Sequence, residues 1–360
     1  MTGAMSAVRP FPAHLVRQDH AHRTVSAMSE SQDESGVDLY GVAVDRSAYA
    51  EAPASLYVYR QRRGDASYAG IICDVAVHAI ADGQVRGHEA VHQTRVDALI
   101  WHHGRSNSPP ALVKLLHRAG PQFTRVVAAA QQTEPTLDFA GPHGFQQTLW
   151  RLGAGPGIDP LIDELAATRL YIADGHHRTA AALGEWRIAG QPAEAGLLCA
   201  VYPADGLTLS AFHRRVSGPV DPTRLLTLLD GAFRVREVAV APAPAVGSLG
   251  LYVGKRWYDV SVTADRLPGA AGLDVAILQS RVLDRLDPAP PGRVRTVDTI
   301  PAATPLDTLL ARCDGDDGAL FTLAPPSAEA VIEVADAGEV MPPKATYFEP
   351  KPAAGMFLRR

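Results

Sequence analysis

Cysteine is scarce in this chain of 360 residues, which has only Cys73, Cys199 and Cys313 and no C-x-x-C pair. Cysteines this far apart argue against a disulfide framework and against a structural zinc site. Cys73 and Cys199 lie in apolar, strand-like runs, where a cysteine usually acts as a small core hydrophobe. The cysteine usage fits a reducing compartment, so we expect a cytoplasmic protein.

Long apolar and long basic runs are also missing. The sequence contains no apolar run of about 18 residues and therefore predicts no transmembrane helix. Its N-terminal residues lack the apolar core of a secretory signal. The formal net charge is -5 and no basic stretch is long enough for a duplex-DNA footprint. We expect neither a membrane nor a duplex nucleic acid as partner, and the sequence leaves the oligomeric state open.

Two common glycine-rich phosphate-binding patterns are incomplete. No segment completes G-x-x-x-x-G-K-[ST], and no G-x-G-x-x-G follows a predicted strand. The segment "LGAGPGID" lacks the third glycine and precedes a helix that starts with Asp-Pro. We interpret it as a loop.

Strand-like and helix-like segments alternate along the chain and are mixed with hairpins. Hydrophobic residues make up 46% and charged residues 20%, as in an ordinary globular protein. This mixture predicts an α/β (α+β) fold with mixed β-sheets and surrounding helices, not a purely parallel sheet. The segments include a polar loop over 29–36, a hairpin over 54–80, a helix over 108–120 and a strand over 122–132.

Helix starts and composition suggest how the chain is organised. Asp159 is predicted to be an N-cap with Pro160 at the first helical position. Asp221-Pro222 repeats this helix start, and Ser327 is a typical N-cap. We expect three parts. They are a partly loop-like N-terminal segment over 1–50, a core domain over 51–218, and a C-terminal α/β region over 219–360.

The segment "YIADGHHRTAAA" places five chemically distinctive residues, 174–178, between a predicted strand and a predicted helix. Gly175 permits a tight turn and close approach of a ligand. The N–H groups that open the helix, together with Arg178, suit a phosphate. His176 and His177 suit hydrogen bonding or a metal, and Asp174 suits Mg²⁺, a histidine or a helix cap. The alternative is purely structural, with Asp174 as an N-cap, Gly175 as a turn residue, and the two histidines and Arg178 in a solvated first turn of the helix.

Three other polar clusters are candidates for the same site. "GHEAVH" carries His88, Glu89 and His92, with Glu89 as a candidate general base. Its alternative is an exposed polar turn. The second cluster is "FHRRV", whose alternative is ordinary surface charge. The third is "MPPKATYFEPK", whose alternative is a C-terminal strap that only packs on the domain. They contribute His213, Arg214, Lys344, Tyr347 and Lys351.

Together these segments resemble the bacterial family called domain of unknown function 1015. Its members show A-D-G-H-H-R, an H-E-x-T segment after a hairpin, a P-T-H-R segment and an M-P-x-K-S-T-Y-F-x-P-K strap. The resemblance covers roughly residues 54–358. This chain departs from it at Val91, at Ala211-Phe212 and at Ala345, which puts the usual substrate in doubt.

The D-G-H-H-R segment also resembles, more distantly, the nucleotide-handling motif of the ParB/sulfiredoxin superfamily, which includes kinases of free serine. The resemblance implies a ParB/sulfiredoxin-like core, ATP or ADP with Mg²⁺, and Glu89 as the base. Gly175, His177 and Arg178 would cradle phosphate. Asp174 and His176 would support catalysis, with Mg²⁺ near Asp174. The remaining nucleotide-binding candidates are His88, His213, Arg214, Lys344, Tyr347 and Lys351.

Three functions follow as hypotheses. The first is a nucleotide-dependent small-molecule kinase that phosphorylates a hydroxyl compound. Free serine is the first acceptor to test, which would place the protein in serine metabolism. The second is a nucleotide-binding regulatory protein without catalysis. The third is a metal-dependent hydrolase with His88, His176, His177 or His213 as ligands.

Overall fold

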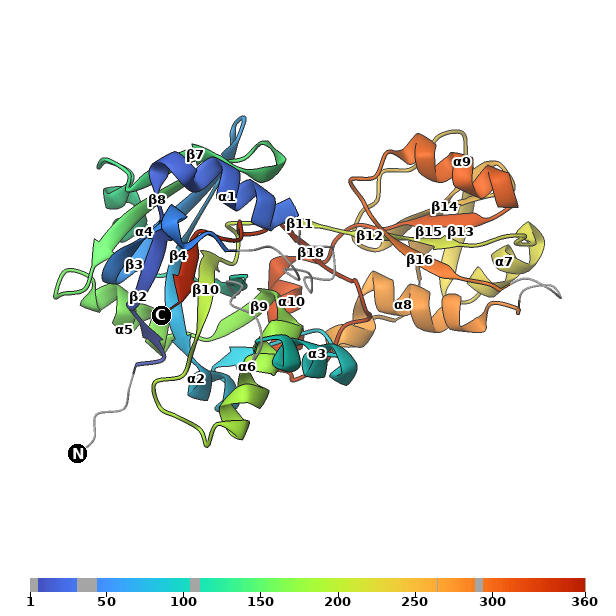
Figure 1. Ribbon diagram of the computed structural model, residues 1–360. Helices are drawn as coiled ribbons and strands as arrows, with labels where there is room; N and C mark the ends of the chain where they lie inside the picture. The colour runs from blue at the N-terminus through green and yellow to red at the C-terminus, as the bar shows by residue number, and fades with distance from the viewer. Residues whose placement is uncertain (1–5, 31–43, 104–110, 264, 289–293, 360) are drawn as a thin grey trace. The chain divides into compact units, whose positions relative to one another are not determined.

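The computed structural model describes residues 6–30, 44–103, 111–263, 265–288 and 294–359. The chain forms two compact units, one of residues 1–207 with 350–360 and the other of residues 208–349 (Figure 1). The division falls at residue 207, whereas the sequence places a boundary at residue 218. Residues 350–360 return to the first unit, although the sequence assigns them to the C-terminal region. Most of the predicted loop over 29–36 lies outside the described residues.

The first unit is built on an 11-stranded mixed β-sheet, and with the helices this confirms the predicted mixed α/β class. Its strands are β1 (Val8–Arg9), β2 (Phe11–Val16), β3 (Tyr49–Arg63), β4 (Ala66–Ala76), β5 (Val85–Arg86), β6 (Val113–His117), β7 (Leu137–Ala140), β8 (Gln146–Gly153), β9 (Leu170–Asp174), β10 (Gly196–Pro203) and β19 (Phe357–Arg359). Along the main path the order is β19-β2-β3-β4-β10-β6-β9-β5. The pairs β6–β10 and β5–β9 are parallel, and the other strand pairs described in this sheet are antiparallel.

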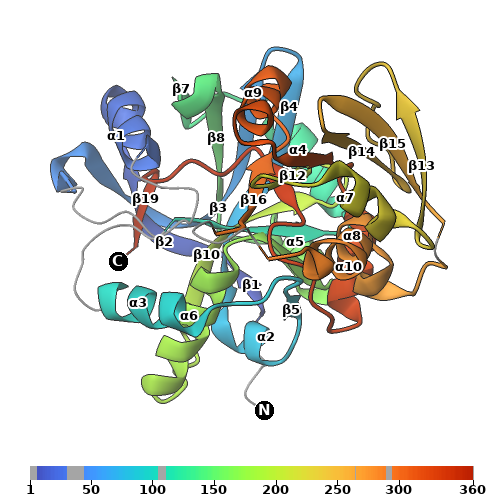
Figure 2. The same cartoon turned by 90° about the vertical axis from the view of Figure 1, so that its right-hand side faces the viewer.

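The helices of the first unit are α1 (Gln18–Glu30), α2 (Val77–Ala81), α3 (Gln93–His103), α4 (Pro121–Ala130), α5 (Asp159–Ala167) and α6 (His176–Ile188). Helix α3 lies beside α6 (Figure 2). Val96 and Leu99 of α3 pack there against Ala181 of α6 in a small buried cluster. This contact holds α6, which begins at the D-G-H-H-R segment, against α3, which follows Glu89 in the sequence.

Two predicted elements are wrong. Residues 113–117 form strand β6, not part of a helix, because all five side chains are buried in the middle of the sheet. Such a strand reads as a continuous apolar run, which sequence periodicity does not separate from a buried helix. Residues 121–130 form helix α4, not a strand, and Phe123, Val126 and Ala130 bury one face of it at helical spacing.

Residues 350–359 close one edge of the first unit's sheet. Strand β19 pairs antiparallel with β2, so that Phe357 lies opposite Leu15. The backbone N–H of Val16 donates to the carbonyl of Met356 at 3.0 Å. Tyr49 donates its hydroxyl to the carbonyl of Gly355 at 2.8 Å. This segment is therefore fastened to the first unit by backbone and side-chain bonds together.

The second unit contains an antiparallel sheet of order β13-β15-β14-β17-β12-β16 and a two-stranded pair, β11–β18. Asp221 caps its first helix by accepting the N–H of Thr223 at 2.9 Å. Ser327 caps its last helix by accepting the N–H of Ala330 at 3.1 Å. The elements are β11 (Thr208–Ser210), β12 (Phe212–Val216), α7 (Pro222–Leu229), β13 (Phe233–Val238), β14 (Ser248–Val253), β15 (Arg256–Val262), α8 (Asp274–Arg281), β16 (Val297–Pro301), α9 (Leu306–Asp316), β17 (Ala319–Thr322), α10 (Ala328–Asp336) and β18 (Tyr347–Glu349).

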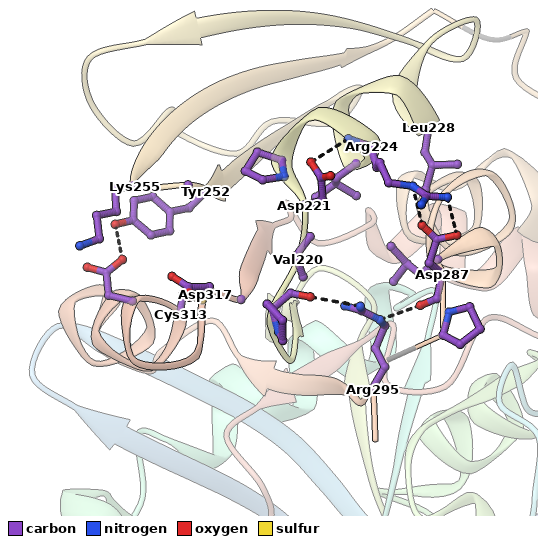
Figure 3. Close-up of a pocket in the computed structure, with 18 residues that line it drawn as sticks. Val220, Asp221, Arg224, Leu228, Tyr252, Lys255, Asp287, Arg295, Cys313 and Asp317 are labelled. Carbon is purple, nitrogen blue, oxygen red and sulfur yellow. Dashed lines mark hydrogen bonds and ion pairs between the residues drawn. The ribbon is translucent and has the colours of Figure 1, made fainter. Parts of the chain in front are cut away.

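The second unit also holds a cavity of about 580 Å³ (Figure 3). Its charged lining is largely engaged within the protein. Arg224 binds both carboxylate oxygens of Asp287. Arg295 donates to three backbone carbonyls, and Tyr252 donates its hydroxyl to Asp314 at 2.8 Å.

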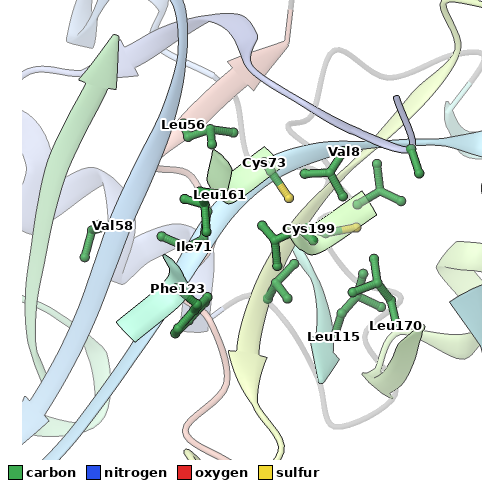
Figure 4. Close-up of a cluster of buried hydrophobic side chains, with 14 of the residues drawn as sticks. Val8, Leu56, Val58, Ile71, Cys73, Leu115, Phe123, Leu161, Leu170 and Cys199 are labelled. Carbon is green, nitrogen blue, oxygen red and sulfur yellow. The ribbon is translucent and has the colours of Figure 1, made fainter. Parts of the chain in front are cut away.

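The core of the first unit lies between its sheet and helices α4 and α5 (Figure 4). Cys73 and Cys199 face each other across the β4–β10 pair, and both are buried. Burial raises the pKa of the Cys73 thiol far above its ordinary value. These two cysteines are core residues, as the sequence predicts.

Candidate functional site

Residues 174–178, here called the DGHHR corner, join β9 to α6. Gly175 has a φ of 105°, in the left-handed region that favours glycine. A Cβ atom at this position would lie 3.1 Å from Cγ2 of Val113 and 3.1 Å from Nη2 of Arg178. Because glycine has no side chain, no N-cap side chain binds the N–H groups that open α6.

Arg178 is held across the corner by two hydrogen bonds. Its Nη2 donates to Oδ2 of Asp174 at 2.5 Å, and its Nη1 donates to the carbonyl of Leu112 at 2.9 Å. The side chain is only 13% exposed. The guanidinium therefore has a fixed position and direction, which is the condition for binding a planar or tetrahedral anion selectively.

The two histidines of the corner grip the segment that carries Glu89, residues 87–92, here called the Glu89 loop. Nε2 of His176 accepts the backbone N–H of His88 at 3.3 Å. Nε2 of His177 accepts the backbone N–H of His92 at 3.0 Å. The rings of His177 and His92 are also stacked, with centroids 5.9 Å apart. Adjacent residues on a helix point in different directions, and here they hold opposite ends of one loop.

His176 is neutral. Burial, with His88 beside it, lowers the pKa of His176 to about 3, and burial lowers that of His88 to about 4. Because Nε2 of His176 accepts a hydrogen bond, its proton is on Nδ1. This Nδ1 lies 3.5 Å from Oε2 of Glu89, whose side chain is 34% exposed. The contact is therefore between a neutral N–H and a carboxylate, and it orients Glu89 without cancelling its charge.

Asp174 is surrounded by positive charge. Burial raises its pKa, but Arg178, Lys351 and Lys114 together lower the pKa below its ordinary value. Lys114 stands opposite Asp174 in the β6–β9 pair. Lys351 has its carbonyl bound by Nε2 of Gln61 at 3.0 Å. Asp174 is thus an ionised carboxylate in a mainly cationic setting.

Four of the predicted site residues lie in the second unit. His213 is buried, and its Nδ1 accepts the N–H of Leu323 at 3.3 Å. Arg214 donates to the carbonyls of Pro343 and Lys344, both at 3.0 Å, and burial lowers its pKa to about 10. The ammonium of Lys344 lies 5.6 Å from the ring centroid of Phe212, and the ring of Tyr347 packs against the same phenylalanine. These contacts fasten the strap within the second unit.

The cavity of the second unit contains none of the predicted site residues, all of which belong to the described part of the chain. The predicted site residues therefore do not line this cavity. We take the DGHHR corner, and not this cavity, as the candidate site, because binding a phosphate needs directed hydrogen-bond donors and not an enclosed apolar volume.

The sequence also suggests these histidines as metal ligands. Within the described ranges, no three His, Cys, Asp or Glu side chains gather as a metal-ligand group. In addition, Nε2 of His176 and Nε2 of His177 each accept a hydrogen bond from a backbone N–H group. Those two nitrogens are hydrogen-bond acceptors in this fold.

Sequence reasoning missed Lys114 and Gln61. Lys114 is a single charged residue inside the apolar run "VKLLH", and that is a signal by itself, because lysine is almost never fully buried without a partner. Gln61 lies in a strand far from the strap in sequence. Nothing in its neighbours indicates that it binds residue 351.

Comparisons with solved structures give several weak similarities. A free serine kinase variant in complex with ADP is 16% identical, over 80% of this chain and 92% of that chain, with a TM-score of 0.42. A conserved hypothetical protein from Pyrococcus furiosus is 16% identical over 80% and 93%, with a TM-score of 0.40. C-terminally truncated SbnI from Staphylococcus aureus is 12% identical over 79% and 85%, with a TM-score of 0.44.

None of the curated proteins compared with this chain matches it. The described helices include none that is long and apolar enough to cross a membrane. The family model described as "Protein of unknown function (DUF1015)" matches residues 46–289, more than half of the sequence. The chain therefore belongs to the family of domain of unknown function 1015, as its DGHHR corner and C-terminal strap predict.

Proposed function

We propose that this protein is a nucleotide-dependent kinase that phosphorylates a small hydroxyl compound, with free serine as the first acceptor to test. One observation carries the proposal. The neutral His176 joins a cationic helix start, suited to phosphate, to the partly exposed carboxylate of Glu89. Phosphoryl transfer needs mainly positioning and charge neutralisation, together with a base that receives the proton of the acceptor.

The residues divide the work between the two substrates. The first-turn N–H groups of α6, Arg178 and Lys351 bind the phosphates, with Asp174 holding Arg178 in place. The Glu89 carboxylate accepts the proton of the acceptor hydroxyl. The hydroxyl oxygen forms a bond to the terminal phosphorus, and the bond to the bridging oxygen breaks. That oxygen leaves with the electron pair on the shortened nucleotide, and the proton on Glu89 passes to water.

Mg²⁺ fits this cluster in the manner usual for nucleotides, in which one or two carboxylates and the phosphates share the ion. Asp174 would be its protein ligand. The ion would neutralise charge on the phosphate oxygens. The work of the protein itself is to keep Asp174 ionised, and the surrounding Arg178, Lys351 and Lys114 do so.

The test is a thermal-shift screen of ATP and ADP with Mg²⁺, crossed with amino acids and polyols. We expect saturating nucleotide to raise the melting temperature by mass action. Glu89→Gln should lower turnover about 100-fold or more, the usual contribution of a general base, and leave nucleotide binding intact. A screen with neither a shift nor turnover would rule out the proposal.

A nucleotide-binding regulatory protein without catalysis is the second candidate. The observations that favour it are Val91, Ala211-Phe212 and Ala345, at positions where the family pattern has other residues. Nucleotide binding without turnover, for every acceptor in the panel, would select this candidate over the kinase.

A further inference from the structure

Gln61 is a buried polar residue whose amide binds two partners. It lies on β3 with an exposed fraction of 1%. Its Nε2 donates to the carbonyl of Lys351 at 3.0 Å, and its Oε1 accepts the hydroxyl of Tyr202 at 3.2 Å. Because a carbonyl can only accept, this arrangement fixes which end of the amide faces Lys351. Gln61 thus links the sheet to the segment that carries a proposed phosphate-binding lysine.

Tyr202 is held in place beside Gln61 by the neighbouring strands. It lies on β10, and its ring packs against Gly70 of β4. A Cβ atom at Gly70 would lie 2.7 Å from the carbonyl oxygen of Val201 and 2.9 Å from two ring carbons of Tyr202. Burial raises the pKa of the Tyr202 hydroxyl well above its ordinary value, so the hydroxyl keeps its proton. The sheet therefore presents a fixed donor to the amide of Gln61.

Residues 351–353 belong to no helix or strand. Side chains of β3 bind their backbone instead. Gln61 binds the carbonyl of Lys351, and the hydroxyl of Tyr59 accepts the N–H of Ala353 at 3.1 Å. The place of Lys351 in the first unit is therefore set by side-chain bonds, and Gln61 makes one of them to Lys351 itself.

Lys351 stands at the partly exposed end of a buried segment. Residues 352–358 are buried, whereas Lys351 is half-buried, so a ligand can reach it. Its charge acts on the carboxylate of Asp174 and lowers the pKa of that group. A lysine side chain has a flexible four-carbon stem, and its ammonium group is directed only if the backbone at its root is fixed. The bond from Gln61 fixes that root.

We propose that Gln61 is a positioning residue of the nucleotide site, which holds the backbone of Lys351 so that the ammonium group meets a phosphate bound beside Asp174. This inference rests on the proposed function and adds to it a residue that touches no substrate. Tyr202 supports Gln61 by fixing the direction of its amide. Without Gln61, the chain keeps the charge of Lys351 but no longer directs it.

A double-mutant cycle with Gln61→Leu and Lys351→Met tests the proposal. Calorimetry measures the binding of ADP and of adenosine to the wild type, both single variants and the double variant. We expect ADP to bind about tenfold more weakly to K351M and about threefold more weakly to Q61L, in line with the loss of a charged and of a neutral hydrogen bond. Adenosine binding should not change. Because Gln61 acts through Lys351, adding Q61L to K351M should weaken ADP binding no further.

Gln147→Leu is the matched control. Gln147 is also buried and lies opposite Gln61 in the β3–β8 pair. Its amide binds Tyr59 and the carbonyl of Phe145. The substitution therefore removes the same amide from the same part of the sheet without touching Lys351. Q147L should bind ADP as the wild type does, even where thermal melts show that it is less stable.

The outcomes separate the two proposals. If Q61L binds ADP as the wild type does, or weakens ADP binding equally with and without Lys351, Gln61 is only structural and the inference fails alone. An effect of Q147L as large as that of Q61L has the same meaning. If K351M binds ADP as the wild type does, the inference fails together with the phosphate-binding role of Lys351. If the wild type binds neither ADP nor inorganic phosphate, the inference and the proposed function fail together.

A second variant covers the case in which Q61L does not fold, which circular dichroism would show. Tyr202→Phe keeps Gln61 and removes only the hydroxyl that directs its amide. It should weaken ADP binding in the wild type and leave it unchanged in the K351M background. Equal effects in the two backgrounds would overturn the proposal as they would for Q61L.

Discussion

His177 accepts the backbone N–H of His92 at 3.0 Å, and this bond ties the second histidine of the DGHHR corner to the far end of the Glu89 loop. His177→Ala removes the acceptor. We expect lower turnover with little change in nucleotide affinity, because the loop loses its hydrogen bond at His92 while Arg178 and Lys351 still bind the phosphates. Amide hydrogen exchange over residues 87–92 should increase in the variant, whether or not the acceptor is known.

The matched control for that variant is His92→Ala. It removes the stacked ring but keeps the backbone N–H that His177 binds. Exchange over the Glu89 loop should therefore change less in H92A than in H177A. Equal changes in the two variants would show that ring stacking, and not the hydrogen bond, holds the loop.

Gly175→Ala is expected to destabilise the first unit by about 1 to 3 kcal/mol, the usual range for a non-glycine residue in a strained backbone conformation. The added Cβ would also press on Val113 and Arg178 at 3.1 Å. Urea unfolding measures the loss. Gly64→Ala is the control, since Gly64 has a φ of 58° but no heavy atom near the added Cβ. A cost for G175A no greater than for G64A would contradict the close contact.

The free energy of unfolding should fall as the pH falls from about 6.5 towards 4. In this range the histidines bind protons in the unfolded chain but not while they are buried in the folded protein. Burial lowers the pKa of His176 to about 3 and that of His88 to about 4, so both are mainly neutral in the folded state down to about pH 5. Each histidine contributes a slope of at most about 1.4 kcal/mol per pH unit. Urea titrations at pH 7, 6 and 5 measure it.

His176→Asn tests the assignment of that slope. The variant should lose the contribution of one proton below pH 6 and match the slope of the wild type between pH 7 and 8, where both histidines are neutral in either state. An unchanged slope at low pH would mean that His176 is protonated in the folded protein, and its role beside Glu89 would need revision.

Lys351→Met should weaken ADP binding with little loss of stability, because the bonds that fasten this segment use the backbone of residues 351–356. Truncation after Glu349 should instead lower the melting temperature by several degrees, since it also removes β19 and its pairing with β2. Thermal melts and calorimetry on both variants separate the two effects. Equal destabilisation by K351M would show that the side chain itself is structural.

The site was predictable where chemistry and local backbone coincide. Asp-Gly between an apolar run and an alanine-rich segment identifies the strand, the turn and the helix start, and the structure has all three at residues 170–188. The helix caps at Asp221 and Ser327 follow from the same local rules. Short-range rules work at these positions because the bonding partners are two or three residues apart. The predicted cap at Asp159 is wrong, because α5 begins at Asp159 itself and its N-cap residue is Ile158.

Long-range partners were not predictable from one sequence. His176 and His177 read as phosphate or metal ligands, because nothing local shows that their nitrogens meet the N–H groups of His88 and His92. The strap reads as one segment, yet residues 208–349 and 350–360 belong to different units. Strand β6 reads as a helix because burial on both faces removes its periodicity. Each of these depends on contacts between distant parts of the chain.

The pairing of β2 with β19 has a consequence for the protein during its synthesis. Strand β2 ends at Val16, and its partner begins at Phe357, so roughly 340 residues separate them. At 5–20 residues per second, a ribosome needs on the order of 20 to 70 seconds to cover that distance. The outer edge of β2 stays open for this time, which exposes it to pairing with other nascent chains. Lys351, which we propose as a phosphate-binding residue, emerges only near the end of this interval.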